Sequence, residues 1–249
     1  SPTYAEEILT PELGIGLDPL LLERRERLFG VLNGIDTNQW DPATDPRIPH
    51  HYTAQSLDQR IGNKTLLQQQ ARIRVQPDVP LIGMVTRLDY VKGMGLMEPV
   101  LEWLLERDVQ IVILGTGQPE YHELLERMQA RYPNKMHAFL KFDDTLARRI
   151  YAGADIFLMP SAVEPCGLGQ MIAMHYGCVP VVRATGGLKD TVSDHTATPG
   201  HGTGFVFDAY TPDACQAALE RALTVYGDKR TWRALQQRGM LADFSWSSS

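Results

Sequence analysis

The sequence has little that would suit it to bind nucleic acid or to enter a membrane. Its 249 residues carry a formal net charge of -6 and contain no cluster of five or more Lys and Arg residues, whereas binding a phosphate backbone needs a basic face. No apolar run approaches the roughly 20 residues that span a bilayer, and the first residues lack the basic-then-apolar pattern of a targeting segment. We therefore expect no nucleic-acid partner and no membrane association.

Cysteine and metal-ligand patterns are sparse as well. The three cysteines, Cys166, Cys178 and Cys215, lack metal-ligand spacing and leave at least one thiol unpaired, which favours a reducing compartment, the cytoplasm or a plastid stroma. The seven histidines form no His-Glu-x-x-His pattern, so we expect no metal. The Gly-x-Gly-x-x-Gly fingerprint of NAD enzymes is also missing, and we expect no cofactor.

What the sequence does have is a regular alternation of short apolar runs and amphipathic segments from residue 79 onward. The runs have the length of buried strands, and the segments between them carry their apolar residues on one helical face. The runs lie at residues 81–85, 109–114, 136–142, 156–159, 179–182 and 205–207. This order predicts an α/β fold with a doubly wound parallel sheet covered by helices.

Residues 1–78 lack this alternation and look like a connecting arm. They contain turn-forming pairs, namely Asn33-Gly34, Asp41-Pro42, Asp45-Pro46 and Ile48-Pro49. The chain begins without Met and stops soon after an aromatic pair, so we expect both ends to be cuts in a longer protein. We also expect residues ~50–249 to fold alone, because the sheet and its helices bury their own core.

Polar residues and glycines gather directly after five of the predicted strands. The carboxyl ends of parallel strands meet at one edge of the sheet, where open α/β sheets bind their ligands. The groups are, in chain order, Arg87 with Lys92, Gly115-Thr116-Gly117, Phe142-Asp143, Glu164 to Gly167, and Thr185-Gly186-Gly187. The sequence therefore predicts five loops that line one rim.

Glu164 lies in the turn between an apolar strand and a helical pattern. The N–H groups that open this helix should point into the crevice, so we expect an anionic or hydroxyl-rich ligand. Glu164 could bond sugar hydroxyls or stabilise positive charge at a reacting carbon, and it could equally be a helix cap. Arg87 and Lys92 could clamp a diphosphate, or they could be two solvated loop cations.

Three further residue groups leave alternatives open. Cys166 could contribute its backbone N–H, while its side chain is best interpreted as a buried, inert thiol. The Gly115-Thr116-Gly117 segment is by itself an ordinary turn. Phe142 is predicted to end the third strand, where it could belong to the core or stack on a base.

Seven motifs, in order along nearly the whole chain, closely resemble those of bacterial glycogen synthases and plant or algal starch synthases. They are Ser1-Pro2-Thr3-Tyr4-Ala5, Leu32-Asn33-Gly34-Ile35-Asp36 with Trp40-Asp41-Pro42, Arg87 with Lys92-Gly93, Leu114-Gly115-Thr116-Gly117, Tyr151-Ala152-Gly153-Ala154-Asp155, Glu164-Pro165-Cys166-Gly167-Leu168 and Ala184-Thr185-Gly186-Gly187-Leu188.

The resemblance implies a retaining glucosyltransferase that moves glucose from ADP-glucose to the non-reducing end of an α-1,4-glucan, without a metal or a protein nucleophile. It implies two Rossmann-like domains that face each other across a cleft. Residues 1–30 would be the trailing end of the N-terminal, acceptor-side domain, residues 31–50 the hinge and connecting arm, and residues 51–249 the C-terminal nucleotide-sugar-binding domain. The family's Lys-x-Gly-Gly-Leu motif of the first domain is absent from this sequence.

By motif, the resemblance also assigns roles. Arg87 and Lys92 would neutralise the diphosphate leaving group, and Glu164 would hydrogen-bond glucose hydroxyls. The remaining donor-binding residues would be Phe142 on adenine, Cys166, Gly167, Leu168 and Gly169 in the turn after Glu164, Gly115, Thr116 and Gly117 in the second loop, and Thr185, Gly186 and Gly187 beside the phosphates.

The sequence departs from the family at two positions. Gly169 stands where the family often has Thr, and Ile172 stands where related glycosyltransferases carry a second acid. Two alternatives remain: a module that binds ADP or a nucleotide sugar without turnover, and a related glycosyltransferase with another donor or acceptor.

Overall fold

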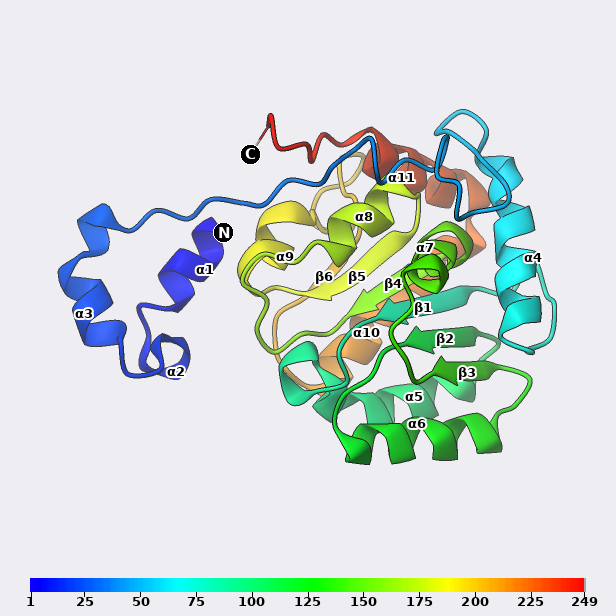
Figure 1. Ribbon diagram of the computed structural model, residues 1–249, viewed down its shortest axis with the longest axis horizontal. Coiled ribbons are helices and arrows are strands. Elements are labelled where there is room, and N and C mark those ends of the chain that lie inside the picture. The colour runs from blue at the N-terminus through cyan, green and yellow to red at the C-terminus, as the bar shows by residue number, and fades with distance from the viewer. Residues whose placement is uncertain (249) are drawn as a thin grey trace.

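The computed structural model describes residues 1–248 and shows one parallel sheet between two layers of helices (Figure 1). The last residue of the predicted domain, Ser249, lies outside the described residues. The six strands are ordered β3-β2-β1-β4-β5-β6, and all five neighbouring pairs are parallel. The predicted α/β fold, a Rossmann-like doubly wound sheet, is therefore confirmed.

The strands are short and the helices that follow them are longer. The strands are β1 Leu81–Val85, β2 Gln110–Leu114, β3 Met136–Phe139, β4 Ile156–Met159, β5 Val179–Arg183 and β6 Phe205–Phe207. The α-helices are α1 Pro2–Glu7, α2 Pro11–Gly14, α3 Asp18–Glu23, α4 Arg60–Gln70, α5 Met97–Leu105, α6 Pro119–Arg131, α7 Asp144–Gly153, α8 Gly169–His175, α9 Gly186–Thr191, α10 Pro212–Gly227 and α11 Lys229–Leu241. Short 3-10 turns lie at η1 Arg25–Arg27, η2 Leu57–Gln59, η3 Tyr90–Lys92 and η4 Met94–Leu96.

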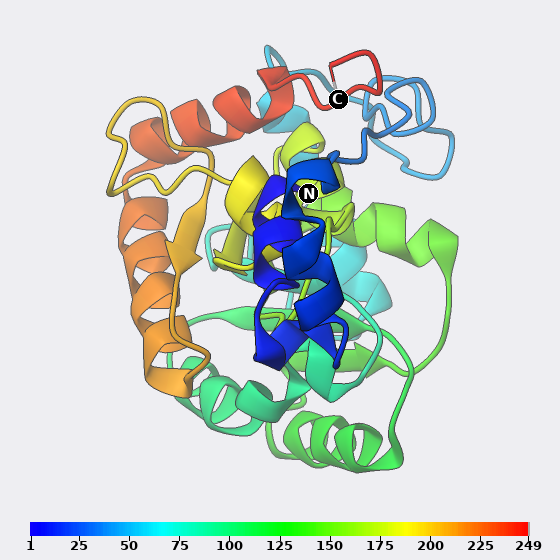
Figure 2. The ribbon, with the colours of Figure 1, turned by 90° about the vertical axis from the view of Figure 1, so that its left-hand side faces the viewer.

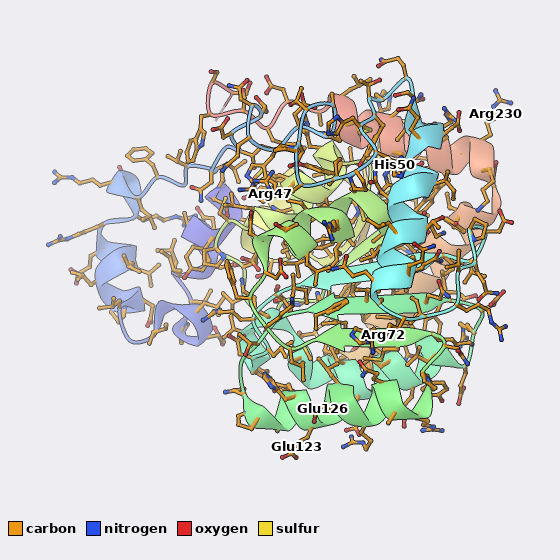
Figure 3. All side chains as sticks on the ribbon, turned by 45° about the vertical axis from the view of Figure 1, so that its right-hand side comes forward. Arg47, His50, Arg72, Glu123, Glu126 and Arg230 are labelled. Carbon is orange, nitrogen blue, oxygen red and sulfur yellow. The ribbon has the colours of Figure 1, made fainter. Side chains whose placement is uncertain are left out.

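Alternation along the strands divides the interior into two main cores. In β1, Ile82 and Met84 pack with α5, α6 and α10, whereas Leu81 packs on the opposite face with α4, α7 and α8. Successive strand side chains point to opposite faces, so one short apolar run serves both layers. The outer side of α6 is polar, and its Glu123 and Glu126 project away from the sheet (Figure 3).

The sequence interpretation was wrong in two places. The third strand ends at Phe139, so Phe142 lies in the following loop, where its side chain is 89% exposed. Within the predicted connecting arm, residues 60–70 form α4, whose buried face is largely polar. Arg60 donates to the carbonyl of Ala154 at 2.7 Å, and Lys64 to the carboxylate of Asp155 at the same distance. Because the inward face lacks an apolar stripe, periodicity could not reveal this helix.

Residues 1–27 form three short helices beside the sheet domain (Figure 1). An extended strap then leads to Ile35, whose N–H donates to the carbonyl of Phe244 at 2.8 Å near the other end of the chain. Turned by 90°, α1 and α3 lie in front of the sheet domain (Figure 2). Among residues 1–248, no helix is both long and apolar enough to cross a bilayer.

A buried ion pair fastens the arm to the domain. Asp45 accepts from Arg148 at 3.0 Å and from the hydroxyl of Tyr176 at 2.6 Å, and the side chains of Asp45 and Arg148 are at most 1% exposed. The Arg148 guanidinium also lies 3.8 Å from the centroid of the Trp40 ring. The Asp45–Arg148 ion pair therefore fixes the position of the Trp40 ring, which packs on the guanidinium.

We expect Asp45→Ala to lower the free energy of unfolding by about 3 kcal/mol, because it removes the buried partner of Arg148 and leaves only the partly exposed Asp144 carboxylate, 3.5 Å from the Arg148 Nε, as a counterion. Burial alone would raise the pKa of Asp45, but bonds from Tyr176, the Arg47 N–H and Arg148 outweigh it and lower that pKa. The carboxylate therefore stabilises the fold above its unfolded pKa of about 3.9, and this contribution is lost as the pH falls through the lower folded pKa.

Urea unfolding at pH 7 and below pH 4 measures both effects. The difference between wild type and Asp45→Ala should shrink at the lower pH. The matched control is Asp58→Ala, which removes an exposed ion pair with Arg233 and should change stability little. Equal stability of wild type and Asp45→Ala at pH 7 would contradict the assigned role.

Candidate functional site

Two hollows adjoin at the carboxyl ends of the strands. The narrower, of about 150 Å³, is lined by the Lys92 and Glu164 side chains, and the wider, of about 320 Å³, by Phe142 and Thr116. Arg87 and the start of α8 line both, so they form one continuous cleft. The site thus lies where an open α/β sheet binds its ligand.

Lys92 and Glu164 form the charged centre of the narrow hollow. The Lys92 Nζ lies 2.9 and 2.7 Å from the two carboxylate oxygens of Glu164, and the side chains are 22% and 6% exposed. The hydroxyl of Ser161 donates to the same carboxylate at 3.0 Å. Glu164 is therefore held as an oriented anion at the floor of the hollow, and the cap of α8 is Leu168 instead.

Two loops hold this pair in place. The Asp89 carboxylate caps η3 by accepting the Lys92 N–H at 2.9 Å. The Val91 carbonyl accepts the N–H of Ala162 at 2.9 Å, which ties the loop after β1 to the loop after β4. The opposed charges consequently sit on loops that are bonded to each other through the backbone.

Arg87 differs from Lys92 in its surroundings. Its side chain is 71% exposed, and its described ion pair is a 3.3 Å contact with Asp89. The guanidinium lies on the shared wall of the two hollows, with donors available for an anion. Since Lys92 is engaged with Glu164, Arg87 is the more accessible cation of the two.

The wider hollow has aromatic and apolar walls. The exposed ring of Phe142 lines it, and Trp40 enters from the arm. Tyr151 lines both hollows and packs edge-on against Trp40, with ring centroids 6.0 Å apart. This arrangement suits a flat, partly apolar group such as a heterocyclic base.

The glycines of the second loop serve packing as well as the cleft. Gly115 and Thr116 line the wider hollow. A Cβ on Gly115 would lie 2.0 Å from the carbonyl oxygen of Thr86, and one on Gly117 would lie 2.2 Å from that of Leu88. Gly117 lines neither hollow, and its assigned contact with a ligand remains a prediction.

Cys166 is not the buried thiol that the sequence suggested. Its side chain is partly exposed, and its Sγ accepts the N–H of Asn33 at 3.1 Å. Gly167, Leu168 and Gly169, which follow it, line the narrow hollow. The turn after Glu164 therefore lines the cleft through residues 167–169 and contacts the strap through Cys166.

The Thr185-Gly186-Gly187 turn lies behind Glu164, and a protein carboxylate occupies it. Glu7, from α1, accepts from the Thr185 hydroxyl at 3.1 Å and from the Gly186 N–H at 3.0 Å. None of the three turn residues lines either hollow of the cleft in the described chain. That these residues lie beside the phosphates of a bound donor remains a prediction.

Two sequence departures also fall in the cleft. Gly169 lines both hollows, and a Cβ there would meet the ring of Phe157 at 3.2 Å. Ile172 lines the wider hollow and is 4% exposed. A larger polar side chain at residue 169 would therefore need its neighbours to shift.

Sequence reasoning assigned no site role to Ser161, Tyr151, Trp40 or Glu7, although Tyr151 and Trp40 lie in motifs of the family resemblance. Ser161 follows a predicted strand directly, so strand-end reasoning could have found it. Tyr151 and Trp40 gave no periodic signal that distinguishes a cleft wall from core. Glu7 is 178 residues from Thr185, and a single sequence contains no signal for that contact. Within residues 1–248, no group of three His, Cys, Asp or Glu side chains is arranged to hold a metal.

Comparisons with known proteins place the cleft in context. Residues 68–235 match the family described as glycosyl transferases group 1. The chain is 52% identical, over its full length, to a glycogen synthase of Anaeromyxobacter sp. (strain K), and 49% identical to glycogen synthase 2 of Geobacter sulfurreducens. It covers 52% and 51% of those proteins, so it spans about half the length of the curated relatives that it matches.

A solved structure agrees with these sequence matches. The catalytic domain of starch synthase IV from Arabidopsis thaliana, bound to ADP and acarbose, superposes on the whole chain with a TM-score of 0.93. Sequence identity is 39%, and the superposition covers 52% of that structure. Both the fold and the half-length coverage are therefore seen in an independent comparison.

Proposed function

Because the chain belongs to the group 1 glycosyltransferases, we propose that it is the donor-binding half of a glycogen or starch synthase. Such an enzyme is retaining and moves glucose from ADP-glucose to the non-reducing end of an α-1,4-glucan. The full-length similarity to proteins named glycogen synthase and to starch synthase IV supports the proposal. The observation that carries it is the cleft itself: an oriented carboxylate, an accessible arginine and an aromatic base-sized hollow, in that order.

The geometry suggests how each part of the donor is held. The adenine lies in the wider hollow beside Phe142, the diphosphate lies at Arg87 where the two hollows meet, and the glucose lies in the narrow hollow over Glu164. A buried carboxylate can bond sugar hydroxyls and stabilise positive charge that develops at the reacting carbon. Loss of the nucleotide leaves negative charge on the diphosphate, which the Arg87 guanidinium stabilises.

Lys92 orients Glu164 in addition to neutralising the diphosphate. Its ammonium has three donors, and two contacts with Glu164 orient the carboxylate before any ligand arrives. The departing phosphate then assists attack from the same face, so that no protein nucleophile is required. The acceptor glucan is held largely by the first domain, across the cleft.

We expect Phe142→Ala to weaken ADP binding to this chain about 5- to 150-fold, because stacking on a base contributes about 1–3 kcal/mol. Isothermal titration of both proteins with ADP measures the difference. Phe29→Ala is the matched control, since Phe29 is 81% exposed and lines neither hollow of the described cleft. Equal affinity of wild type and Phe142→Ala would show that the base lies elsewhere.

The chain by itself acts as a nucleotide-sugar binding module in this proposal. It supplies the donor side of the cleft, whereas transfer needs donor and acceptor held together. We infer that the enzyme is located in the cytoplasm if it is bacterial, or in a plastid stroma otherwise.

A further inference from the structure

Glu7 brings a carboxylate from the first helix onto the backbone behind the site. Its Oε1 lies 3.1 Å from the Thr185 Oγ1 and 3.0 Å from the Gly186 backbone nitrogen, and its Oε2 lies 3.3 Å from the same hydroxyl. Thr185 is 1% exposed, so its hydroxyl is out of reach of bulk water. Without Glu7, both donors would lose their acceptor.

A second pair of contacts holds α1 in the same place. The Thr3 N–H donates to Asp190 at 3.0 Å, and the Thr3 hydroxyl donates to the other oxygen of that carboxylate at 2.5 Å. Asp190 lies on α9, which begins at Gly186. Figure 2 shows α1 lying across the front of the sheet domain. Helix α1 is thus bonded to both ends of α9.

The Thr185-Gly187 turn, to which Glu7 is hydrogen-bonded, packs against the turn that contains Glu164. The Gly187 N–H donates to the Glu164 carbonyl at 3.1 Å. A Cβ on Gly186 would lie 1.9 Å from that carbonyl oxygen, and one on Gly187 would lie 1.9 Å from the carbonyl oxygen of Cys166. With no space between the two turns, a shift of residues 185–187 must move Glu164 or Cys166.

We infer that Glu7 is a positioning residue for glucosyl transfer, acting on Glu164 through the Thr185-Gly187 turn. The inference rests on the proposed function, because it concerns the same reaction. It extends the proposed function by assigning a role to Glu7 of α1, which lies in the segment expected to be the trailing end of the first domain. The orientation of the Glu164 carboxylate then depends on where α1 is docked, so placement of the first domain is coupled to the donor-side carboxylate.

The test is steady-state kinetics of the full-length enzyme with ADP-glucose and maltooligosaccharide. Glu7→Ala should lower kcat about 10- to 100-fold, since a small misplacement at a reacting centre has effects of that size. The donor KM should change little, because Arg87 and Phe142 are untouched. Glu7→Gln keeps an acceptor oxygen at the same reach and should recover most of the lost kcat. Glu6→Ala is the control, because Glu6 lies on the same helix, is exposed and pairs with Arg25.

Hydrogen exchange of the Gly186 and Gly187 amides provides the second readout. Both amides should exchange faster in Glu7→Ala than in wild type and in Glu6→Ala. Unchanged exchange, or faster exchange with wild-type kcat, would overturn the inference. The two proposals fail differently: a folded wild-type enzyme that makes no glucan overturns the proposed function, whereas active wild type with equally active Glu7→Ala overturns only the role of Glu7.

Discussion

Glu164→Gln is expected to reduce glucosyl transfer by the full-length enzyme by about 10²–10³-fold, with a small effect on donor affinity. The substitution preserves shape but removes the negative charge that lines the narrow hollow, where we propose that the glucose binds. Charge that is fixed in advance matters most in the transition state, so the loss should appear in kcat. Initial rates with ADP-glucose and a maltooligosaccharide acceptor, together with single-turnover measurements, separate chemistry from binding.

The control for this substitution is Glu123→Gln on the solvent side of α6 (Figure 3). It removes the same charge far from the cleft and should leave kcat unchanged. Thermal unfolding of both variants establishes that each is folded. Wild-type turnover in a folded Glu164→Gln enzyme would remove Glu164 from the proposed machinery.

Arg87 and Lys92 are expected to respond differently although sequence alone gives them one role. Arg87→Ala should lower transfer about 10²–10³-fold, because it removes the accessible charge at the proposed diphosphate position. It should change the free energy of unfolding by less than about 0.5 kcal/mol, since the side chain is 71% exposed. Lys92→Ala should lower transfer and also destabilise the fold, because it leaves the nearly buried Glu164 carboxylate without its counterion.

Transfer assays and urea unfolding on the same protein samples measure both properties. Arg127→Ala is the control, because Arg127 is an exposed cation on α6 that pairs with Glu98 outside the cleft. It should affect neither transfer nor stability. Equal stability of Arg87→Ala and Lys92→Ala would contradict the stabilising role assigned to the ion pair between Lys92 and Glu164.

Much of the fold could be predicted because strand burial imposes a strong pattern. The runs at residues 81–85, 156–159 and 205–207 match β1, β4 and β6 to the residue. At the start of α10, Thr211 and Pro212 form a cap that is readable from the sequence, with the Thr211 hydroxyl accepting the Ala214 N–H. Each of these signals is local, so it can be recognised from the residues of the element itself.

Other features could not be predicted because they depend on contacts between distant segments. Helix α4 buries Arg60 and Lys64, and only their partners in other elements explain why. Lys92 and Glu164 are 72 residues apart in the sequence. The motifs predicted that both residues lie near a ligand, but not that they form an ion pair with each other. Phe142 was predicted to end the third strand because the apolar run extends to residue 142, whereas pairing with β2 stops at Phe139.

We propose that this cleft binds the adenine nucleotide of the donor. Calorimetric titration of the chain with ADP, ADP-glucose and UDP-glucose, alongside Arg87→Ala, measures that binding. We predict that both adenine nucleotides bind, that UDP-glucose binds more weakly, and that Arg87→Ala weakens the binding of ADP and ADP-glucose. A cooperatively folded chain that binds neither adenine nucleotide, or binds them equally well with and without Arg87, would contradict the account.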